Sequence, residues 1–187
     1  MIVALSVACI LPYPTFSPRA NITSKDLYNI NNAHESENVI LKPSNISVSN
    51  LNWFDTVNTM FKTYTKTRVI DIKSGLTYYV YRNGGHNHAD VEPIDRENTA
   101  IFKKIYNGNW SWARRPVWVE LADGTFVAGS INGFPHGKSY IDNTGMDGHT
   151  CIHFLKSKTH GTKRVDKDHQ DAVAYAYAHK DEIEKYL

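Results

Sequence analysis

Cysteine is scarce in this chain, whose 187 residues include only Cys9 and Cys151. Two cysteines cannot build the set of disulfides that holds small secreted domains together, so the fold depends on a hydrophobic core. Long hydrophobic runs are scarce as well. The apolar run Met1–Leu11 is too short to cross a bilayer, which takes roughly 20 residues, and we expect no membrane span in the mature chain.

An excess of charge of one sign is also missing. Lys and Arg number 21 against 19 Asp and Glu, which leaves a net charge of +2. So small an excess does not require a nucleic-acid partner, and we expect none; it suits an anionic wall polymer as well as no polymer at all. No internal repeat is visible, and a chain of this length with 41% hydrophobic residues suffices for one core rather than two domains.

The apolar run Met1–Leu11 fits the hydrophobic region of a signal peptide, with Ser6-Val7-Ala8 as a small-residue cleavage site before Cys9. A basic stretch ahead of the run is missing, which leaves a start further upstream open. Acylation of Cys9, as in a lipoprotein, is the weaker alternative, because Ser6 stands where the usual signal has Leu. We expect residues 1–20 to be a signal or leader segment and the protein to be exported.

Residues 21–48 are rich in Asn and Ser and show no sustained hydrophobic period, which is typical of a flexible linker. Periodic patterns begin near Ser49, so residues 49–187 are the predicted domain. Its fold class is α+β: a single domain with one mostly antiparallel β-sheet and helices packed around it. The first expected elements are a helix capped by Ser49 or Asn50 and continuing through Phe61, a hairpin of strands 68–72 and 76–82, and a loop over 84–90. A helix capped by Asp95 and ended by Asn107-Gly108 should follow, and then a hairpin of strands 116–121 and 125–130. The last expected elements are a strand over 149–154 and a C-terminal helix capped by Asp166.

The predicted strand around Cys151 carries the residues best suited to chemistry. Alternation along a strand places His149, Cys151 and His153 on one face. An imidazolium beside a thiol stabilises the thiolate, so this trio predicts an activated nucleophile with a base next to it. The same three side chains also suit zinc, which takes Cys and His ligands. A buried cysteine without function is the plain alternative, but three polar residues are costly to bury idle.

A family resemblance rests on two short motifs. Pro135-His136-Gly137, followed after a Gly/Asn-rich interval by Gly148-His149-Thr150-Cys151-Ile152-His153, resembles the catalytic domain of the L,D-transpeptidases (YkuD type). The family pattern has Ser or Thr at the position of Gly148, Gly at Thr150, and Arg or Asn at His153. The resemblance implies that Cys151 attacks a peptidoglycan stem peptide and passes the acyl group to an amine, with His149 as base or orienting partner and His136 as a site histidine.

A second resemblance covers most of residues 51–175. The chain is similar to a group of exported, wall-associated proteins of Gram-positive bacteria, which implies a bacterial, extracellular or cell-wall location and peptidoglycan as partner. The segments that carry it are His88-Ala-Asp-Val-Glu-Pro93, Trp110-Ser-Trp-Ala-Arg-Arg-Pro116, Gly148–Phe154 and Ser157-Lys-Thr-His-Gly161.

A zinc site is the competing hypothesis. The segment His86-Asn-His88-Ala-Asp90, with a later pair of histidines on one strand face, resembles the ligand pattern of the peptidase superfamily that contains lysostaphin and the D-Ala-D-Ala metallopeptidases. That resemblance implies His86 or His88, Asp90, His149 and His153 as ligands and a metal-bound water as nucleophile. The late pair is His-x3-His here, where the superfamily has His-x-His.

The sequence offers further candidate site residues. His160 follows the strand and can turn back over it, or it belongs to a solvated basic turn. Trp110 and Trp112 can stack on a sugar, and Arg114 and Arg115 can bind a stem-peptide carboxylate. At alternating spacing, the tryptophans equally suit the core.

Three functions remain open on the sequence. The leading hypothesis is a cysteine acyl-transfer enzyme without cofactor, whose nucleophile stands alone once the leader is removed. The second is a Zn²⁺-dependent peptidoglycan peptidase or amidase, and the third is a wall-binding module without catalysis.

Overall fold

The computed structural model describes residues 46–187, so the predicted leader and most of the predicted linker lie outside the described residues. The described part begins at Ile46, three residues before the predicted start of the domain. Val48 is already buried in the two-residue strand β1 (Val48–Ser49).

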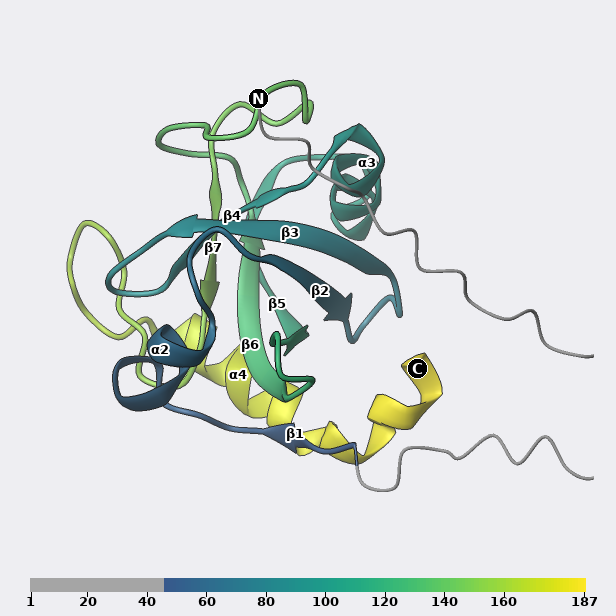
Figure 1. Cartoon of the computed structure of the whole chain (residues 1–187), viewed down its shortest axis with the longest axis vertical. Coiled ribbons are helices and arrows are strands. Elements are labelled where there is room, and N and C mark those ends of the chain that lie inside the picture. The colour runs from purple at the N-terminus through teal and green to yellow at the C-terminus, as the bar shows by residue number, and fades with distance from the viewer. Residues whose placement is uncertain (1–45) are drawn as a thin grey trace, which may run out of the picture. The chain divides into compact units, whose positions relative to one another are not determined.

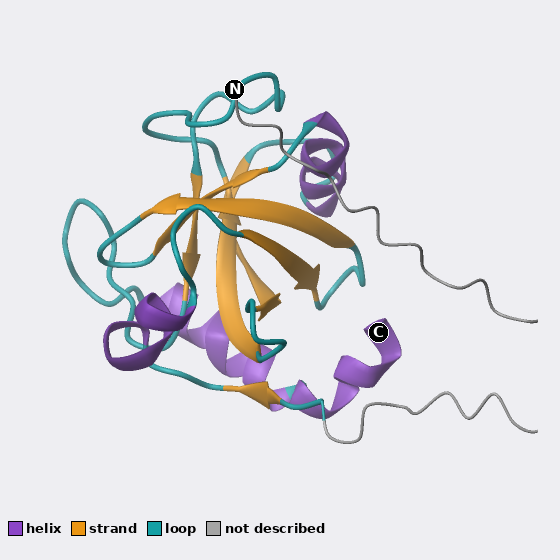
Figure 2. Cartoon of the chain, viewed as in Figure 1, coloured by secondary structure: helices purple, strands orange, loops and turns teal. Residues whose placement is uncertain are grey.

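Six strands of a seven-stranded sheet close into an antiparallel barrel (Figures 1 and 2). Around the barrel, β2 pairs with β3, β3 with β4, β4 with β7, β7 with β6, β6 with β5, and β5 again with β2. The seventh strand, β1, lies outside the ring and pairs in parallel with β6. The predicted antiparallel α+β fold is confirmed. The barrel strands are β2 (Lys66–Asp71), β3 (Thr77–Gly84), β4 (Ala89–Pro93), β5 (Ser111–Glu120), β6 (Phe126–Gly133) and β7 (Thr150–His153).

Two of the predicted helices form where their caps predicted them. Asp95 accepts a hydrogen bond from the backbone N–H of Asn98 at 2.8 Å and starts α3 (Arg96–Ile105). Asp166 accepts one from His169 at 2.9 Å and starts α4 (Lys167–Ala178). A side-chain oxygen at the N-cap satisfies a backbone N–H that has no partner within the helix. A 3₁₀ helix, Lys180–Tyr186, follows α4.

The first predicted helix was wrong in its start and type. Asn52, not Ser49 or Asn50, is the cap, because Ser49 is held in β1; the Asn52 side chain accepts from the N–H of Phe54 at 3.0 Å. A π-helical turn, Trp53–Val57, then leads into α2 (Asn58–Met60). The predicted loop over 84–90 was also wrong at its end, since Ala89 and Asp90 begin β4, which is paired on both sides.

The barrel wall separates two apolar clusters. Val117, Val119 and Val127 point into the barrel, while Trp118 and Phe126 point outward, as alternation along a strand requires. The outer residues pack against α4, where the indole N–H of Trp118 donates to the carbonyl of Ala176 at 2.8 Å. Helix α4 is thereby fixed along β5 and β6, beside the strand that carries Cys151 (Figure 1).

Candidate functional site: a buried Cys–His–Asp cluster

Cys151 lies in the middle of β7 and is only 3% exposed. Strand β4 pairs with it on one side, with Asp90 directly opposite Cys151. On the other side, β6 pairs with β7 and places Ser130 opposite His153. Cys151, Asp90 and His153 therefore stand on paired strands, and the strand pairing fixes their positions.

His136 is the histidine closest to the thiol. Its Nε2 lies 3.1 Å from the sulfur of Cys151, and its Nδ1 lies 2.9 Å from the carbonyl oxygen of Phe134. A carbonyl oxygen only accepts, so Nδ1 carries the hydrogen and Nε2 is free to accept the thiol proton. A thiol, an imidazole that can accept its proton and a carbonyl that orients the imidazole are thus joined by two short contacts, a set of groups that nucleophilic catalysis can use.

The backbone of His136 pairs with that of His149, through two hydrogen bonds of 2.8 and 2.9 Å. Glycines next to both histidines permit this close approach. Gly137 has a φ of +66°, and a Cβ there would lie 2.4 Å from the His149 ring; Gly148 has a φ of +112°, and its Cβ would lie 2.8 Å from the carbonyl oxygen of His136. Only glycine adopts such a conformation without strain, which explains the His-Gly and Gly-His pairs of the motif.

Asp90 lies at the centre of the remaining histidines. Its Oδ1 is 3.2 Å from Nε2 of His88, 3.2 Å from Nε2 of His160 and 3.9 Å from Nε2 of His149. Burial alone would raise the pKa of Asp90, but the electrostatic interactions with these histidines, that with His88 first, bring the pKa below its usual value. Asp90 is therefore an ionised carboxylate beside the thiol.

This arrangement does not favour a thiolate in the resting site, contrary to the prediction. Burial, and then the negative charge of Asp90, raise the pKa of the Cys151 thiol well above its ordinary value. Burial also lowers the pKa of His136. A buried site disfavours both charged forms, so the resting pair is a neutral thiol and a neutral imidazole.

The predicted strand-face trio is brought together only in part. Cys151 and His153 line one cavity of about 170 Å³. His149 stands just before β7; one of its ring nitrogens lies within 4.8 Å of the Cys151 sulfur, and its Nε2 is 3.9 Å from Oδ1 of Asp90. His160 also lines the cavity, at its exposed side, which is the first of the two placements that the sequence left open. The lining is completed by His88, Trp112, Arg114, Asn132, His136, Thr159 and His169.

The four predicted substrate-binding residues separate into two pairs. Trp112 and Arg114 line the cavity; the Trp112 ring stacks on Phe134 and, at 5.1 Å, approaches the ring of His136. Trp110 instead packs against α3, and Arg115 binds the fully buried carboxylate of Asp71 at 2.5 and 2.9 Å. Of the predicted metal ligands, His86 is exposed and lies at the edge of the Phe54 ring, outside the cluster.

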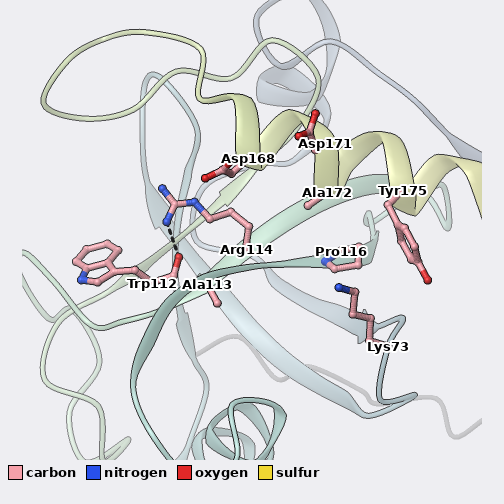
Figure 3. Close-up of a pocket in the computed structure, with 9 residues that line it drawn as sticks. All are labelled: Lys73, Trp112, Ala113, Arg114, Pro116, Asp168, Asp171, Ala172 and Tyr175. Carbon is pink, nitrogen blue, oxygen red and sulfur yellow. Dashed lines mark hydrogen bonds between the residues drawn. The ribbon is translucent and has the colours of Figure 1, made fainter.

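A larger cavity of about 400 Å³ adjoins the first and shares Trp112 and Arg114 with it (Figure 3). Its walls are β5 and α4, with Asp168 and Asp171 on the helix and Lys73 at the far end from Trp112. Arg114 donates to the backbone oxygen of Trp112 and lies 3.3 Å from Asp166. The cavity at the buried cluster therefore lies beside an open groove that carries both acidic and basic groups.

Sequence reasoning missed His169 and Asn132. His169 stacks on His153 with ring centroids 3.7 Å apart, and its Nδ1 is 2.8 Å from the hydroxyl of Ser130. Burial lowers the pKa of His169 to about 3, and it lowers that of His153 further, so both rings are neutral walls of the cavity. The signal for His169 was its place on the buried stripe of α4, with Ala172, Val173 and Ala176.

Glu92 was missed as well, and it supports the site from a distance. Its buried carboxylate accepts hydrogen bonds from the backbone of Tyr140 and Ile141 and from the side chains of Asn83 and Ser139, at 2.7–3.2 Å. These bonds hold the loop that connects His136 to His149. A buried carboxylate satisfied by four donors is a fixed anchor for that loop.

The fold and the site define an α+β barrel protein with a buried Cys–His–Asp cluster. No family model, no curated protein and no solved structure matches the chain. Within residues 46–187, no helix is both long and apolar enough to cross a membrane.

Proposed function

We propose that the protein is a cysteine acyl-transfer enzyme of the L,D-transpeptidase type, acting on peptidoglycan stem peptides. One observation carries the proposal: Nε2 of His136 lies 3.1 Å from the sulfur of Cys151, while the Phe134 carbonyl holds Nδ1. The L,D-transpeptidase-like motifs supply the substrate class, because His136-Gly137 and His149-Thr150-Cys151 are the segments that build this pair.

Because Cys151 and His136 are both neutral at rest, the order of the proton transfers in the reaction is as follows. As the sulfur of Cys151 attacks the peptide carbonyl, His136 Nε2 takes the thiol proton, and it then gives that proton to the departing amine. The product is a thioester on Cys151. An acceptor amine attacks the thioester, its proton passes to His136, and the thiolate that leaves is reprotonated from the same nitrogen.

The cavity walls offer the groups that such a substrate needs. Arg114 is the cation nearest the thiol cavity and suits a stem-peptide carboxylate, while Trp112 offers a ring that is 48% exposed for an apolar or sugar face. Asn132 accepts through Oδ1 from the Phe134 backbone and from Thr150, which leaves its amide group as a donor for the carbonyl oxygen under attack. The adjoining groove has room for the second peptide, with Asp168 and Asp171 to attract its amine.

The proposed location rests on the resemblance of residues 51–175 to exported, wall-associated proteins of Gram-positive bacteria. The proposed location is the bacterial cell wall or the outside of the cell, and acyl transfer through Cys151 uses no cofactor. Peptidoglycan stem peptides are the proposed partner.

Mass spectrometry of the whole chain after incubation with a stem tetrapeptide, or with a β-lactam as a stable acyl donor, tests the proposal. We expect one acyl group on Cys151, absent from Cys151→Ala and retained in Cys9→Ala, which removes the other cysteine. An adduct that persists in Cys151→Ala would overturn the cysteine mechanism. Retention on purified sacculi without an adduct or a new muropeptide would instead indicate a wall-binding module.

A further inference from the structure

The buried histidine His88 has a ring nitrogen without a hydrogen-bond partner. His88 is 1% exposed, and its Nδ1 lies 2.6 Å from the carbonyl oxygen of Lys158. Because a carbonyl oxygen only accepts, Nδ1 carries the hydrogen and the lone pair of Nε2 faces the cluster. That Nε2 atom makes no hydrogen bond to any of residues 46–187, although it is 3.2 Å from Oδ1 of Asp90.

Oδ1 of Asp90 is surrounded by further atoms that can bind a metal. Nε2 of His160 also lies 3.2 Å from it, and the sulfur of Cys151 lies 3.9 Å away. Lone pairs and a carboxylate that face one another at these distances repel unless a cation or a proton lies between them. A fixed Nδ1 hydrogen with an inward Nε2 lone pair is also how proteins orient histidines that bind metals.

The distances are close to those of a tetrahedral metal site. Zinc bonds of 2.0–2.1 Å to nitrogen or oxygen and 2.3 Å to one sulfur place neighbouring ligand atoms about 3.3–3.6 Å apart. The separations around Asp90 are 3.2, 3.2 and 3.9 Å, and the ligand atoms of His88, Asp90, Cys151 and His160 all lie within 4.8 Å of one another.

We propose that His88, Asp90, Cys151 and His160 bind a divalent cation of the zinc type, and that the bound metal masks the thiol. Coordination releases the thiol proton to solvent, and the thiolate and carboxylate together neutralise the two charges of the ion. Because the sulfur is then no longer available to His136, the metal-bound form does not carry out acyl transfer. The masking role rests on the proposed function, whereas the binding site does not.

A second set of ligand atoms, from His136, His149, Cys151 and His160, is equally compact. We assign the ion to the first set because it contains the carboxylate of Asp90, whose buried negative charge the ion neutralises. The assignment keeps His88 and Asp90 of the zinc site expected from the sequence. It replaces His149 and His153 with Cys151 and His160, and it leaves out His86.

Cobalt chloride, used as a spectroscopic substitute for zinc, tests the site in the purified chain. We expect one Co²⁺ per chain, with visible bands of tetrahedral cobalt and a thiolate-to-cobalt charge-transfer band. Cys151→Ser should lose the charge-transfer band. His160→Ala, at a half-exposed loop position, and the isosteric Asp90→Asn should each weaken binding about tenfold or more.

His86→Ala is the matched control, because it removes an exposed histidine from the loop that carries His88 and should bind Co²⁺ like the parent protein. Binding lost in His136→Ala but kept in Asp90→Asn would overturn the assigned ligands, and an absence of stoichiometric cobalt would overturn the site itself. Zinc should also block labelling of Cys151 by iodoacetamide, with recovery after chelation. Acyl transfer that requires added metal would overturn masking while leaving the site in place, and acyl transfer that fails with and without metal would count against the proposed function alone.

Discussion

Nε2 of His136 lies 3.1 Å from the sulfur of Cys151, and the two residues are 15 positions apart in the chain. The imidazole in contact with the thiol therefore comes from the loop after β6 rather than from the strand neighbours of the cysteine. His149, the other candidate base, directs Nδ1 at the carbonyl of Lys138 and Nε2 toward Asp90. The two histidines thus have different partners, and their substitution should have different effects.

His136→Ala should lower kcat for acyl transfer about 10²- to 10⁴-fold with little change in KM, because the variant lacks the proton acceptor. His136→Gln should not restore the rate, since an amide keeps the shape but accepts no proton at neutral pH. Steady-state kinetics measures both values, and His179→Ala, at the end of α4, is the control. A variant lacking His136 with normal kcat, beside an inactive His149→Ala, would transfer the role of base to His149.

Substitutions of the two neighbouring arginines on β5 should have different effects, on the stability of the fold for Arg115 and on substrate binding for Arg114. Arg115→Ala leaves the carboxylate of Asp71, which is fully buried, without its cation, and we expect a loss of about 3–5 kcal/mol in unfolding free energy. Arg114→Ala removes a cation that is 25% exposed at the cavity, and should raise KM with a smaller change in stability. Denaturant unfolding and steady-state kinetics measure the two effects. If Arg115→Ala raised KM and left stability intact, Arg115 would be a substrate residue.

Acid should destabilise the fold through His169. Its pKa in the folded state is about 3, because burial and the charge of Arg114 oppose protonation, against 6.5 in the unfolded chain. Below pH 6.5 His169 binds a proton in the unfolded chain but not in the folded chain, so stability falls as the pH drops from 6.5 toward 3. The lowered pKa of His153 acts in the same direction.

His169→Gln should flatten this decline by up to about 1.4 kcal/mol per pH unit, because one proton fewer is taken up on unfolding. Urea unfolding at a series of pH values from 8 to 4 measures the slope. Val173→Ala, a cavity-forming change on the same helix, is the control and should lower stability equally at every pH. An unchanged slope in His169→Gln would show that other groups cause the acid loss.

Much of the local structure was predictable from the sequence, because caps, turns and periodicity are local signals. Asp95 and Asp166 start their helices as predicted, and Asn107, with a φ of 55°, together with Gly108, at 79°, ends α3. Strand β4 was not predictable in this way. It is buried along all five residues, so it has no alternation, and its Asp and Glu suggest a loop.

The chemistry of the site was predictable in its residues but not in their roles. The sequence indicated Cys151, His136 and His160 by motif and neighbourhood. The position of Asp90 beside the thiol depends on the pairing of β4 with β7 across 61 positions, which no local pattern encodes. Burial keeps both Cys151 and His136 neutral, and this burial results from the whole barrel rather than from a local segment of the sequence.

The closing of the barrel has a consequence for how the chain acquires reactivity. Strand β7 joins β6 through only two residue pairs, Ser130 with His153 and Ile131 with Ile152, and it meets β4 through three. Cys151 and its carboxylate neighbour are brought together by the strand that completes the ring. In a nascent or partly folded chain the thiol is therefore not yet beside Asp90 and His136, and the Cys–His–Asp cluster forms only together with the finished fold.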